Sequence, residues 1–431
     1  MALGEVQQVS NQDAIFQTFL DKSISDIVDL KAPTWKKVKA AAKTVGTTQK
    51  GRDKAVLSDV RTNFKAGPSN MDYPVGTVFK RERLKSVPVD QVVTYEIDRA
   101  TYDDYQNGNP TCLVSMAEET DLLMRAFAER KEFWLAGTGS GKLGTLAAGS
   151  TTTVLNLDTV SNGTPAKAYG VSQLKPQVAY DLYTSADVLS ASNLEIIEGG
   201  VDYTNNQVTL SAALGGAPAV GAYLVPNGSW FNLPHGFAYL FQGGKTGYWE
   251  GLTVTNRQEY QTPFVNAAGN EISNIYIERA LQKQAFRTGL GLNKTFKIFA
   301  SPTQISVYKA GGWNMFRFAS KDDTYNTAFK NARYEDSVFE PFPKADPDTF
   351  YGVDMSDLIY IEQTKMGPFK GADGLMFNRK QGSGQHGKGE FFMQYGVSDN
   401  FTIDHPELHM VVRNLQATAT EVTIWNFTST T

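Results

Sequence analysis

The chain has 431 residues, which is enough for two or three structural units, and its formal net charge of −4 is too small to indicate a nucleic-acid or membrane partner overall. Its single cysteine, Cys112, excludes an internal disulfide and indicates a reducing cytosol or no constraint on the compartment. We expect no signal peptide, since no basic and then apolar run opens the chain, and no membrane span, since no stretch approaches ~20 apolar residues.

The first 57 residues predict a helical arm with one basic side. Apolar residues at helical spacing predict a helix over 11–30, which Asn11 caps and Pro33 ends. A second helical pattern follows, and its basic side is either a solvated face or a surface that lies against an anion, such as packaged nucleic acid or an acidic neighbour. Its apolar side carries Trp35, Val38, Ala42 and Val45, and its basic side carries Lys36, Lys37, Lys39 and Lys43.

The segment 58–98 predicts an extended loop with two arms around a centre rich in Gly and Pro. A charged two-stranded arm with few apolar residues cannot be stable alone, so we expect it to lie on another chain or on the rest of this one. The basic residues of the outgoing arm, which only Glu82 opposes, are Lys80, Arg81, Arg83 and Lys85.

The segment Cys112–Leu135 predicts one long helix that organises the chain. Ser115 and Glu118 form a capping box at its start, and Arg130 and Lys131 lie near its end, where the helix dipole favours cations. A single spine helix among short alternating segments predicts an α+β fold, in which a mixed sheet lies across that helix. The apolar stripe of this helix consists of Met116, Leu123, Phe127 and Trp134, with Leu122, Ala126 and Phe133 beside it, and Gly137, Gly139 and Gly141 follow its end.

The segment 174–229 predicts a small β insertion that folds semi-independently. Val201 and Tyr203 face Val208 and Leu210 across a turn at Asn205–Asn206, which indicates a hairpin.

Residues 251–310 predict a strand–helix–strand–helix unit. The first helix closes at Gly289, and the second starts at Ser301–Pro302, where Gln304 completes a capping box, and ends at Gly311–Gly312. Strands return in the C-terminal part, with the sequences DLIYIEQT, LMFNRK, EFFMQYGV, LHMVVRNLQ and EVTIWNF.

The segment AGTGSGKL, residues 136–143, is similar to a phosphate-binding loop but fails three requirements. Ala136 replaces the first glycine, Leu143 replaces the hydroxyl that holds magnesium, and a helix precedes the loop where a strand is required. We expect a helix stop followed by a connection, and no cofactor.

Other candidate chemistry is equally sparse. His405 and His409 have no Cys and no third His nearby, so we expect structural or solvent-facing histidines and no metal site. Cys112 is either a thiol activated by a helix N-terminus or a small residue near a buried helix start. The acid pairs Asp103–Asp104 and Asp322–Asp323 fall in apparent loops, where solvated turns are the alternative to acid–base chemistry. No G-x-S-x-G motif is present, and we expect a protein that is not an enzyme.

Basic and aromatic residues alternate around Trp313 and Arg317. This pattern fits nucleic-acid binding by stacking or an intersubunit contact equally well.

The order of these elements resembles the major capsid protein of tailed bacteriophages, whose fold is shared with encapsulin shells. The most specific stretch is GLTVTNRQEYQTPFVNAAGNEIS, Gly251–Ser273. The resemblance covers nearly the whole chain and implies an icosahedral shell fold. Its parts would be an N-terminal arm (1–57), an extended loop (58–98), a peripheral domain with the spine helix (99–173), the β insertion (174–229), an axial domain (230–345), and return strands of the peripheral domain with a C-terminal tail (346–431).

The resemblance further implies self-assembly as hexamers and pentamers around double-stranded DNA, which would be bound non-specifically. It implies a virion location after assembly in the host cytoplasm, with portal and scaffolding proteins as partners, a decoration protein as a further candidate and no membrane. Intersubunit contacts would involve Lys80, Arg81, Arg83, Lys85, Trp313 and Arg317, and the lumen-facing basic surface would be Lys36, Lys37, Lys39 and Lys43. The alternatives are an encapsulin-type compartment around protein cargo and a nucleotide-binding enzyme that uses the AGTGSGKL loop.

Overall fold

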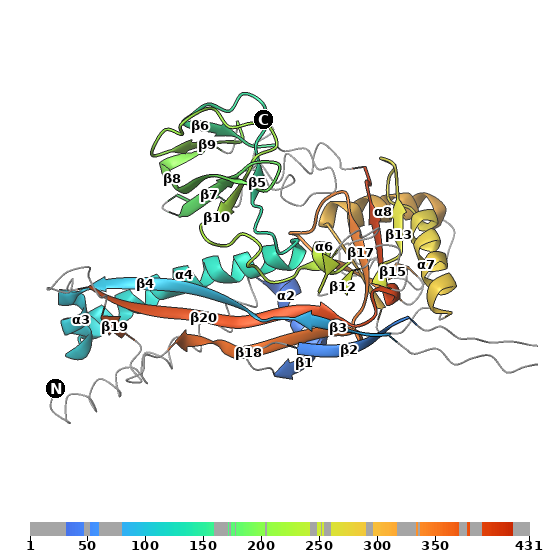
Figure 1. The fold of residues 1–431 in the computed structure, drawn as a ribbon, viewed down its shortest axis with the longest axis horizontal. Helices are drawn as coiled ribbons and strands as arrows, with labels where there is room; N and C mark the ends of the chain where they lie inside the picture. The colour runs from blue at the N-terminus through green and yellow to red at the C-terminus, as the bar shows by residue number, and fades with distance from the viewer. Residues whose placement is uncertain are drawn as a thin grey trace, which may run out of the picture.

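The computed structural model shows an elongated α+β molecule with a separate β unit above it (Figure 1). The α+β class predicted from the sequence is confirmed. The predicted helix over 11–30, the predicted strand over 421–427, Asp322–Asp323 and Arg317 lie outside the residues that the structure describes. The described residues are 32–46, 52–59, 80–158, 171, 174–176, 178–202, 205–241, 248–250, 252–253, 260–289, 296–316, 333–334, 337–369, 377–379 and 390–416.

A long sheet forms the floor of the body, and helix α4 (Pro110–Ala136) crosses it (Figure 1). Strand β20 is central, because it pairs along its length with β4 on one side and with β18 and β19 on the other. The strands of this sheet are β1 (Lys43–Gly46), β4 (Val89–Asp98), β18 (Leu358–Phe369), β19 (Phe377–Arg379) and β20 (Glu390–Ile403).

Helix α4 is the predicted spine helix, but it starts earlier than its capping box suggested. Asn109 is the N-cap, since its side chain accepts a hydrogen bond of 3.1 Å from the Thr111 N–H, and Pro110 occupies the first helical position. Ser115 therefore lies inside the helix. The predicted stripe is buried at Met116 and Phe127, whereas Leu122 is 64% exposed.

The structure also bears on two predictions about polar residues near the start of α4. Cys112 lies within α4, and burial raises the pKa of its thiol, which favours the small-residue alternative over an activated thiol. Asp103 and Asp104 lie on the short helix α3 (Arg99–Gln106), not in a loop.

Helix α2 (Pro33–Ala41) packs against α4 through Trp35 and Val38. The buried carboxylate of Glu132 on α4 accepts hydrogen bonds from the backbone N–H groups of Thr34 (3.2 Å) and Trp35 (2.9 Å). These N–H groups have no partner within their own helix, so Glu132 supplies the cap that the sequence of α2 lacks. The predicted helix ends before Val45, which lies on strand β1 opposite Ile361 of β18.

A buried ion pair joins α4 to the long sheet. The Lys131 ammonium lies 2.7 and 2.8 Å from the two carboxylate oxygens of Asp399 on β20, and both side chains are 2% exposed. The hydroxyl of Tyr360 and the amide of Gln91 each donate a further hydrogen bond of 2.6 Å to Asp399. Burial lowers the pKa of Lys131, and Asp399 limits that decrease by favouring the ammonium. The sequence-based expectation for Lys131, a cation near a helix end, missed this pairing.

The β insertion has its own core and stands above α4 (Figure 1). It begins near Gly144, earlier than the predicted 174, because β5 and β6 belong to it. The predicted hairpin is present, with Val201 opposite Val208 and Asn206 in the left-handed region at φ 54°. Its strands are β5 (Gly144–Thr145), β6 (Val154–Asn156), β7 (Ala179–Tyr183), β8 (Leu189–Asp202), β9 (Gln207–Leu210) and β10 (Tyr223–Pro226).

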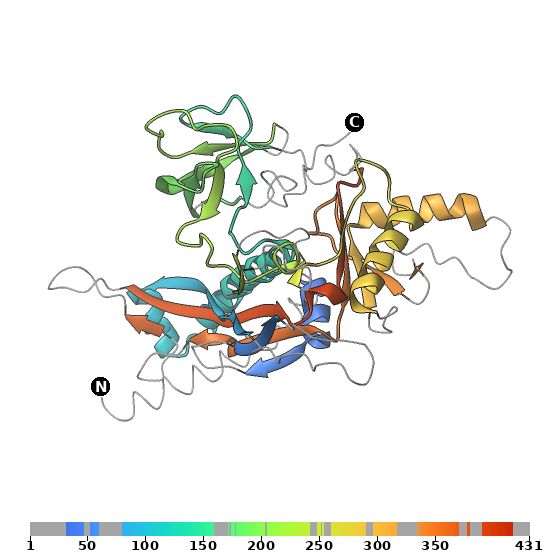
Figure 2. The same cartoon turned by 45° about the vertical axis from the view of Figure 1, so that its right-hand side comes forward.

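A second sheet stands at one end of the body, with helices α7 (Asn274–Thr288) and α8 (Pro302–Phe316) on its outer side (Figure 2). Helix α7 ends at Gly289 as predicted, with φ 66°. Helix α8 passes through Gly311–Gly312, so the predicted stop there is wrong. The strands of this second sheet are β13 (Phe264–Asn266), β14 (Phe296–Ala300), β15 (Arg333–Tyr334), β16 (Ser337–Pro341), β17 (Phe350–Asp354) and β21 (Met410–Arg413).

The capping box predicted for α8 is half formed. The Ser301 hydroxyl accepts a hydrogen bond of 3.3 Å from the Gln304 N–H, whereas the Gln304 side-chain amide donates to the carbonyls of Pro347 and Gln416. Gln304 thus joins the helix start to the C-terminal segment.

The C-terminal strands divide between the two sheets, since β17 and β21 belong to the second one.

The body also contains α6 (Phe237–Leu240), β11 (Tyr248–Trp249), β12 (Leu252–Thr253) and the 3-10 helix η4 (Pro406–Leu408). In the part of the chain that the structure describes, no helix combines the length and the hydropathy of a membrane span.

The Lys131–Asp399 pair gives a stability test. Replacement of Lys131 by Met leaves a buried carboxylate without its cation, so we expect a loss of ~3–5 kcal/mol in the free energy of unfolding, measured by urea denaturation. The double variant K131M/D399N removes that charge and should recover about half of the loss. The matched control is R125M, because the Arg125–Asp121 pair is exposed, and it should cost under ~0.5 kcal/mol. A loss below ~1 kcal/mol for K131M would show that the pair does not fasten α4 to the sheet.

Candidate functional site

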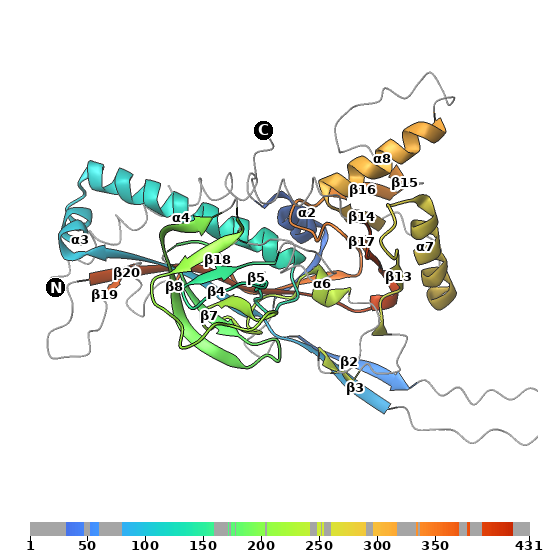
Figure 3. The same ribbon diagram turned by 90° about the horizontal axis from the view of Figure 1, so that it is seen from above.

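A two-stranded ribbon leaves the body beside the second sheet (Figure 3). It consists of β2 (Arg52–Asp59) and β3 (Lys80–Ser86), which pair antiparallel from Arg52 opposite Ser86 outward to Asp59 opposite Lys80. Strand β2 therefore starts before the extended loop predicted at 58–98, and β4, predicted within that loop, belongs to the long sheet. The base of the ribbon touches the body, and the strands then continue away from it (Figure 3).

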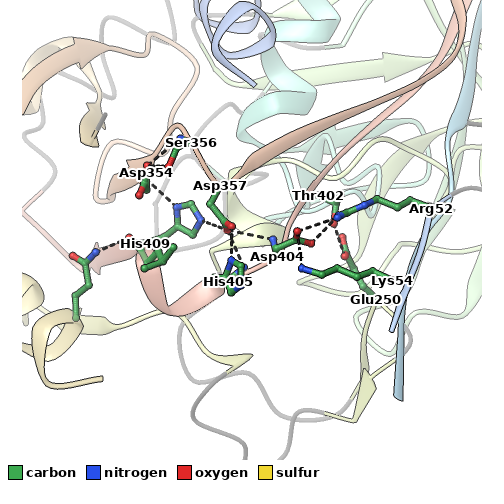
Figure 4. Close-up of polar contacts among 12 residues, drawn as sticks. Arg52, Lys54, Glu250, Asp354, Ser356, Asp357, Thr402, Asp404, His405 and His409 are labelled. Atoms are coloured by element: carbon green, nitrogen blue, oxygen red, sulfur yellow. Dashed lines mark hydrogen bonds and ion pairs between the residues drawn. The ribbon is translucent and has the colours of Figure 1, made fainter. Parts of the chain in front are cut away.

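The first contact at the base is an ion-pair cluster on Asp404, which follows directly after β20 (Figure 4). Arg52 donates two hydrogen bonds, of 2.8 and 2.9 Å, to the two carboxylate oxygens of Asp404. The Lys54 ammonium lies 2.8 Å from the same carboxylate. Bidentate pairing fixes the direction of the arginine as well as its charge, so Asp404 sets the angle at which β2 leaves the body.

The second contact holds β3. Leu84 is 3% exposed and belongs to the main core of the body. The next residue, Lys85, donates its backbone N–H to the carbonyl of Glu250 at 2.7 Å. The buried side chain of Glu250 in turn accepts a hydrogen bond of 2.6 Å from Thr402 of β20 and lies 3.2 Å from His235 Nδ1. Both ribbon strands are thus fastened to the end of β20.

Asp357 holds the turn that carries Asp404 (Figure 4). One of its oxygens, Oδ2, accepts the backbone N–H groups of Asp404 (3.2 Å) and His405 (2.8 Å), and Oδ1 lies 2.7 Å from His405 Nδ1. His409, which is buried, contacts Asp357 Oδ2 through Nε2 at 3.2 Å and accepts the Asp354 N–H at Nδ1. Because Nδ1 of His409 accepts, its proton sits on Nε2 and points at Asp357.

The electrostatics of this turn follow from these contacts. Burial alone would raise the pKa of Asp357, but the hydrogen bonds from His405 and His409 outweigh it and lower that pKa. Burial would likewise raise the pKa of Asp404, but the hydrogen bonds from Arg52 and Lys54 outweigh the effect of burial and lower that pKa. The Asp357 carboxylate raises the pKa of His405. The arrangement stabilises two carboxylates and one imidazolium in a fixed geometry.

These contacts describe an anchor and offer no open coordination position on His409. In the described part of the chain, no group of three or more His, Cys, Asp or Glu side chains could hold a metal ion. The prediction that His405 and His409 are structural agrees with their shared contact to Asp357. The segment AGTGSGKL connects α4 to the insertion, and its Lys142 contacts Asp187 at 3.2 Å and lies over the ring of Tyr223.

The intersubunit residues predicted from the sequence lie at scattered places. Lys80, Arg81, Arg83 and Lys85 are on β3, and Lys85 is exposed at its base. Trp313 lies in the last turns of α8, away from the ribbon in sequence and in space (Figure 3). Their role as contacts stays a prediction.

The lysines predicted to face the lumen lie on α2 and β1. Lys37 forms an ion pair of 2.6 Å with Glu340, and Lys39 forms one of 3.1 Å with Glu362. Lys36 and Lys43 are exposed. Part of the basic charge is therefore neutralised within the chain, and the role of these four lysines as a lumen-facing surface stays a prediction.

Sequence reasoning missed Asp404, Asp357 and Glu250. Asp404 stands directly before His405, in a segment singled out only for its histidines. Its partners Arg52 and Lys54 are about 350 residues earlier. The position of Asp404 next to His405 was a signal in the sequence, but nothing in the sequence links Asp404 to Arg52 and Lys54.

No family model matches the sequence, and no curated protein does. Among solved structures, the chain is similar to the Cyanophage A-1(L) capsid asymmetric unit, with 9% identity, 88% of this chain and 93% of that chain covered, and a TM-score of 0.48. It is similar to the capsid of a native GTA particle, with 9% identity, coverages of 87% and 89%, and a TM-score of 0.40. It is also similar to the satellite phage P4 procapsid including size determination (Sid) protein, with 10% identity, coverages of 93% and 90%, and a TM-score of 0.36.

The anchor at Asp404 can be tested by substitution to Asn. Loss of the carboxylate charge removes the ion pairs to Arg52 and Lys54, so the base of the ribbon should open more often. We expect trypsin to cut after Arg52 and Lys54 about fivefold faster, which corresponds to a local loss of ~1 kcal/mol. Asp90, exposed on β4, gives the control D90N, which should cut at the wild-type rate. Equal cutting in D404N would mean that Asp404 does not anchor the ribbon.

The His405–Asp357 contact makes stability depend on pH. The folded pKa of His405 is raised, so its contribution is full below pH ~6.5 and is lost as the pH rises through the folded pKa. The folded pKa of Asp357 is lowered, so its contribution is full above pH ~4 and is lost as the pH falls through the folded pKa.

The substitution H405Q should therefore flatten the pH dependence of the melting temperature above pH ~6.5. It should also weaken the acid side of the profile, because the His405 side chain helps to lower the pKa of Asp357. Because the His405 side chain is 53% exposed, the effect should stay under ~1 kcal/mol. An unchanged alkaline slope in H405Q would refute the assignment.

Proposed function

We propose that this chain is the major capsid protein of a tailed bacteriophage, which assembles as hexamers and pentamers into an icosahedral shell around double-stranded DNA and catalyses no reaction. The observation that carries the proposal is the β2–β3 ribbon, whose described side-chain contacts with the body are all at its base. A two-stranded ribbon is at best marginally stable in water, so a ribbon of this kind requires a further surface to lie on. A neighbouring copy supplies that surface in a shell.

The charge of the ribbon supports a protein surface as its support. Its two strands contain six basic and three acidic residues, so positive charge is in excess by three. The remaining positive charge would pair with an acidic surface of the neighbour. Lys80, Arg81 and Arg83 are the residues we assign to that contact.

The shape of the body also supports a shell. Helix α4 has 27 residues and is therefore about 40 Å long, and β4 and β20 run beside it (Figure 1). A plate of this length presents broad faces and edges for contacts with copies, as symmetric rings require. We assign Lys36, Lys37, Lys39 and Lys43 to a basic inner surface that contacts the phosphates of packaged DNA. Trp313 and Arg317 remain candidates for contacts between subunits.

Such a shell would be built in the host cytoplasm and end as part of the virion. Portal and scaffolding proteins are its expected partners, with a decoration protein as a further candidate. Electron microscopy and the nucleic-acid content of native particles test this proposal. Closed shells that contain double-stranded DNA support it, whereas shells filled with protein cargo would favour an encapsulin-type compartment. A chain that stays monomeric when co-expressed with the proteins of its own genome neighbourhood would contradict it.

A shortened ribbon separates assembly from folding. Joining Ala55 directly to Arg83 through an Asn-Gly turn keeps the base, because these residues are opposite each other in the ribbon. We expect the melting temperature of the subunit to stay within a few degrees and the yield of particles to fall at least about tenfold, because the surface that reaches the neighbour is gone. Sedimentation measures the particle yield. Wild-type assembly by the shortened chain would exclude the ribbon as an assembly element.

A further inference from the structure

Large apolar side chains are exposed at several places of the described chain, and two of these places also carry exposed charged residues. One is the β insertion, where Val188, Leu189 and Val220 are at least half exposed and Ile197 is 41% exposed. The other is helix α7, where Phe286 is 91% exposed and Ile275 is 57% exposed. Clusters of this kind mark interaction surfaces more often than single exposed residues do.

The insertion carries its apolar residues on a rim, which we define as the loop Ser211–Val220 with Leu189, Glu195, Ile197 and Glu198 of β8. The loop, SAALGGAPAV, contains no charged residue, and most of its residues are exposed. The loop starts where the Ser211 N–H donates to the Glu195 carbonyl at 2.8 Å. At its other end, a Cβ on Gly221 would lie 3.7 Å from the Ser185 side chain, in the turn that carries Val188. The loop therefore starts beside Glu195 of β8 and ends near the turn that precedes β8.

Acidic charge accompanies this rim. Residues 144–226 contain six acidic and two basic residues, a net charge of −4 that equals the net charge of the whole chain. Glu195 and Glu198 are exposed on either side of Ile197. A partner of the rim should therefore combine an apolar side chain with positive charge.

Helix α7 has these properties. Ile275, Gln282 and Phe286 fall on one stripe, because 275 and 286 are three turns apart. Arg279 and Lys283 are exposed along one flank of this stripe, although Lys283 also donates to the Phe264 carbonyl, and Glu278 lies on the other flank. The opposite face of α7 packs Ile277 and Ala280 into the second core, so the stripe points outward.

We propose that the rim of one copy docks on the α7 stripe of a neighbouring copy in the shell, with Glu195 and Glu198 facing Arg279 and Lys283. This inference rests on the proposed shell function. The insertion and α7 lie apart on the molecule (Figures 1 and 3), so the two patches of one chain serve two different neighbours. A head-to-tail contact of this kind forms a ring when its rotation closes, as capsomers require. The small side chains of the loop let the Phe286 ring approach the backbone closely, and the charges fix the orientation.

A charge swap tests the contact. The variants E195K/E198K and R279E/K283E each place like charges opposite each other, so particle formation followed by light scattering should slow at least about tenfold. The variant with all four substitutions restores opposite charges and should assemble within about twofold of the wild-type rate. The control D103K/D104K reverses exposed charges on α3 and should assemble as the wild type does. Thermal unfolding of each variant confirms that the subunit is folded.

A cross-link gives a second measurement. In a C112S background, V220C/F286C should form disulfides between subunits in oxidised particles, seen as multimers on a denaturing gel, and each single cysteine variant should not form such ladders. Failure of the four-fold variant to recover, normal assembly of either double reversal, or absence of the ladder would overturn the contact. None of these results bears on the proposed function, which is tested by whether wild-type particles form and whether they contain double-stranded DNA.

Discussion

A ribbon of two strands has no second layer to cover it, and this constraint governs the architecture of the chain. Burial of apolar surface is the main source of folding stability, and Leu84 is the apolar side chain of β2–β3 that the structure describes in the core of the body. Farther out, the ribbon consists mainly of charged residues and unpaired strand edges. Unpaired edges and charges favour association with another surface. The body must therefore present the ribbon in a defined direction, and a neighbour must receive it.

The end of β20 provides that direction. Lys131 fixes this strand to the spine helix at Asp399, and Thr402 fixes it to Glu250 three residues later. Asp404, next along the chain, holds Arg52 and Lys54, and Asp357 holds the backbone of Asp404 itself. One short segment thus couples the buried core to the exposed ribbon. A carboxylate that accepts several hydrogen bonds is held rigidly, because each bond restricts a different motion. Such rigidity fits a segment that fixes the direction of the ribbon.

Local patterns in the sequence predicted the elements that depend on local interactions. The spine helix, the hairpin at Asn205–Asn206 and the helix end at Gly289 follow from periodicity and from residues that tolerate positive φ. The helix start was placed too late because Asn109 and Pro110 are a stronger cap than the Ser115 box, and both signals were present. Gly311–Gly312 did not stop α8, since glycine in a helix interior costs only ~1 kcal/mol per residue relative to alanine.

The anchor could not be predicted because its partners are brought together only by the complete fold. Arg52 and Asp404 are 352 residues apart, and Lys131 and Asp399 are 268 apart. A lysine near a helix end looks like a dipole-stabilised surface residue until the sheet that buries it is known. The sequence predicts that the charged two-stranded arm lies on another chain or on the rest of its own chain. It does not predict which residues of its own chain hold the base of that arm.

The central claim is that the outer ribbon becomes ordered on another copy. Amide hydrogen exchange, compared between free subunits and purified particles, tests it most directly. The account predicts that the amides of Val56–Asp59 and Lys80–Glu82 exchange at least about 100-fold more slowly in particles, while those at Arg52 and Lys85 change little. Equal protection of the outer ribbon in the free subunit and in the particle would contradict it.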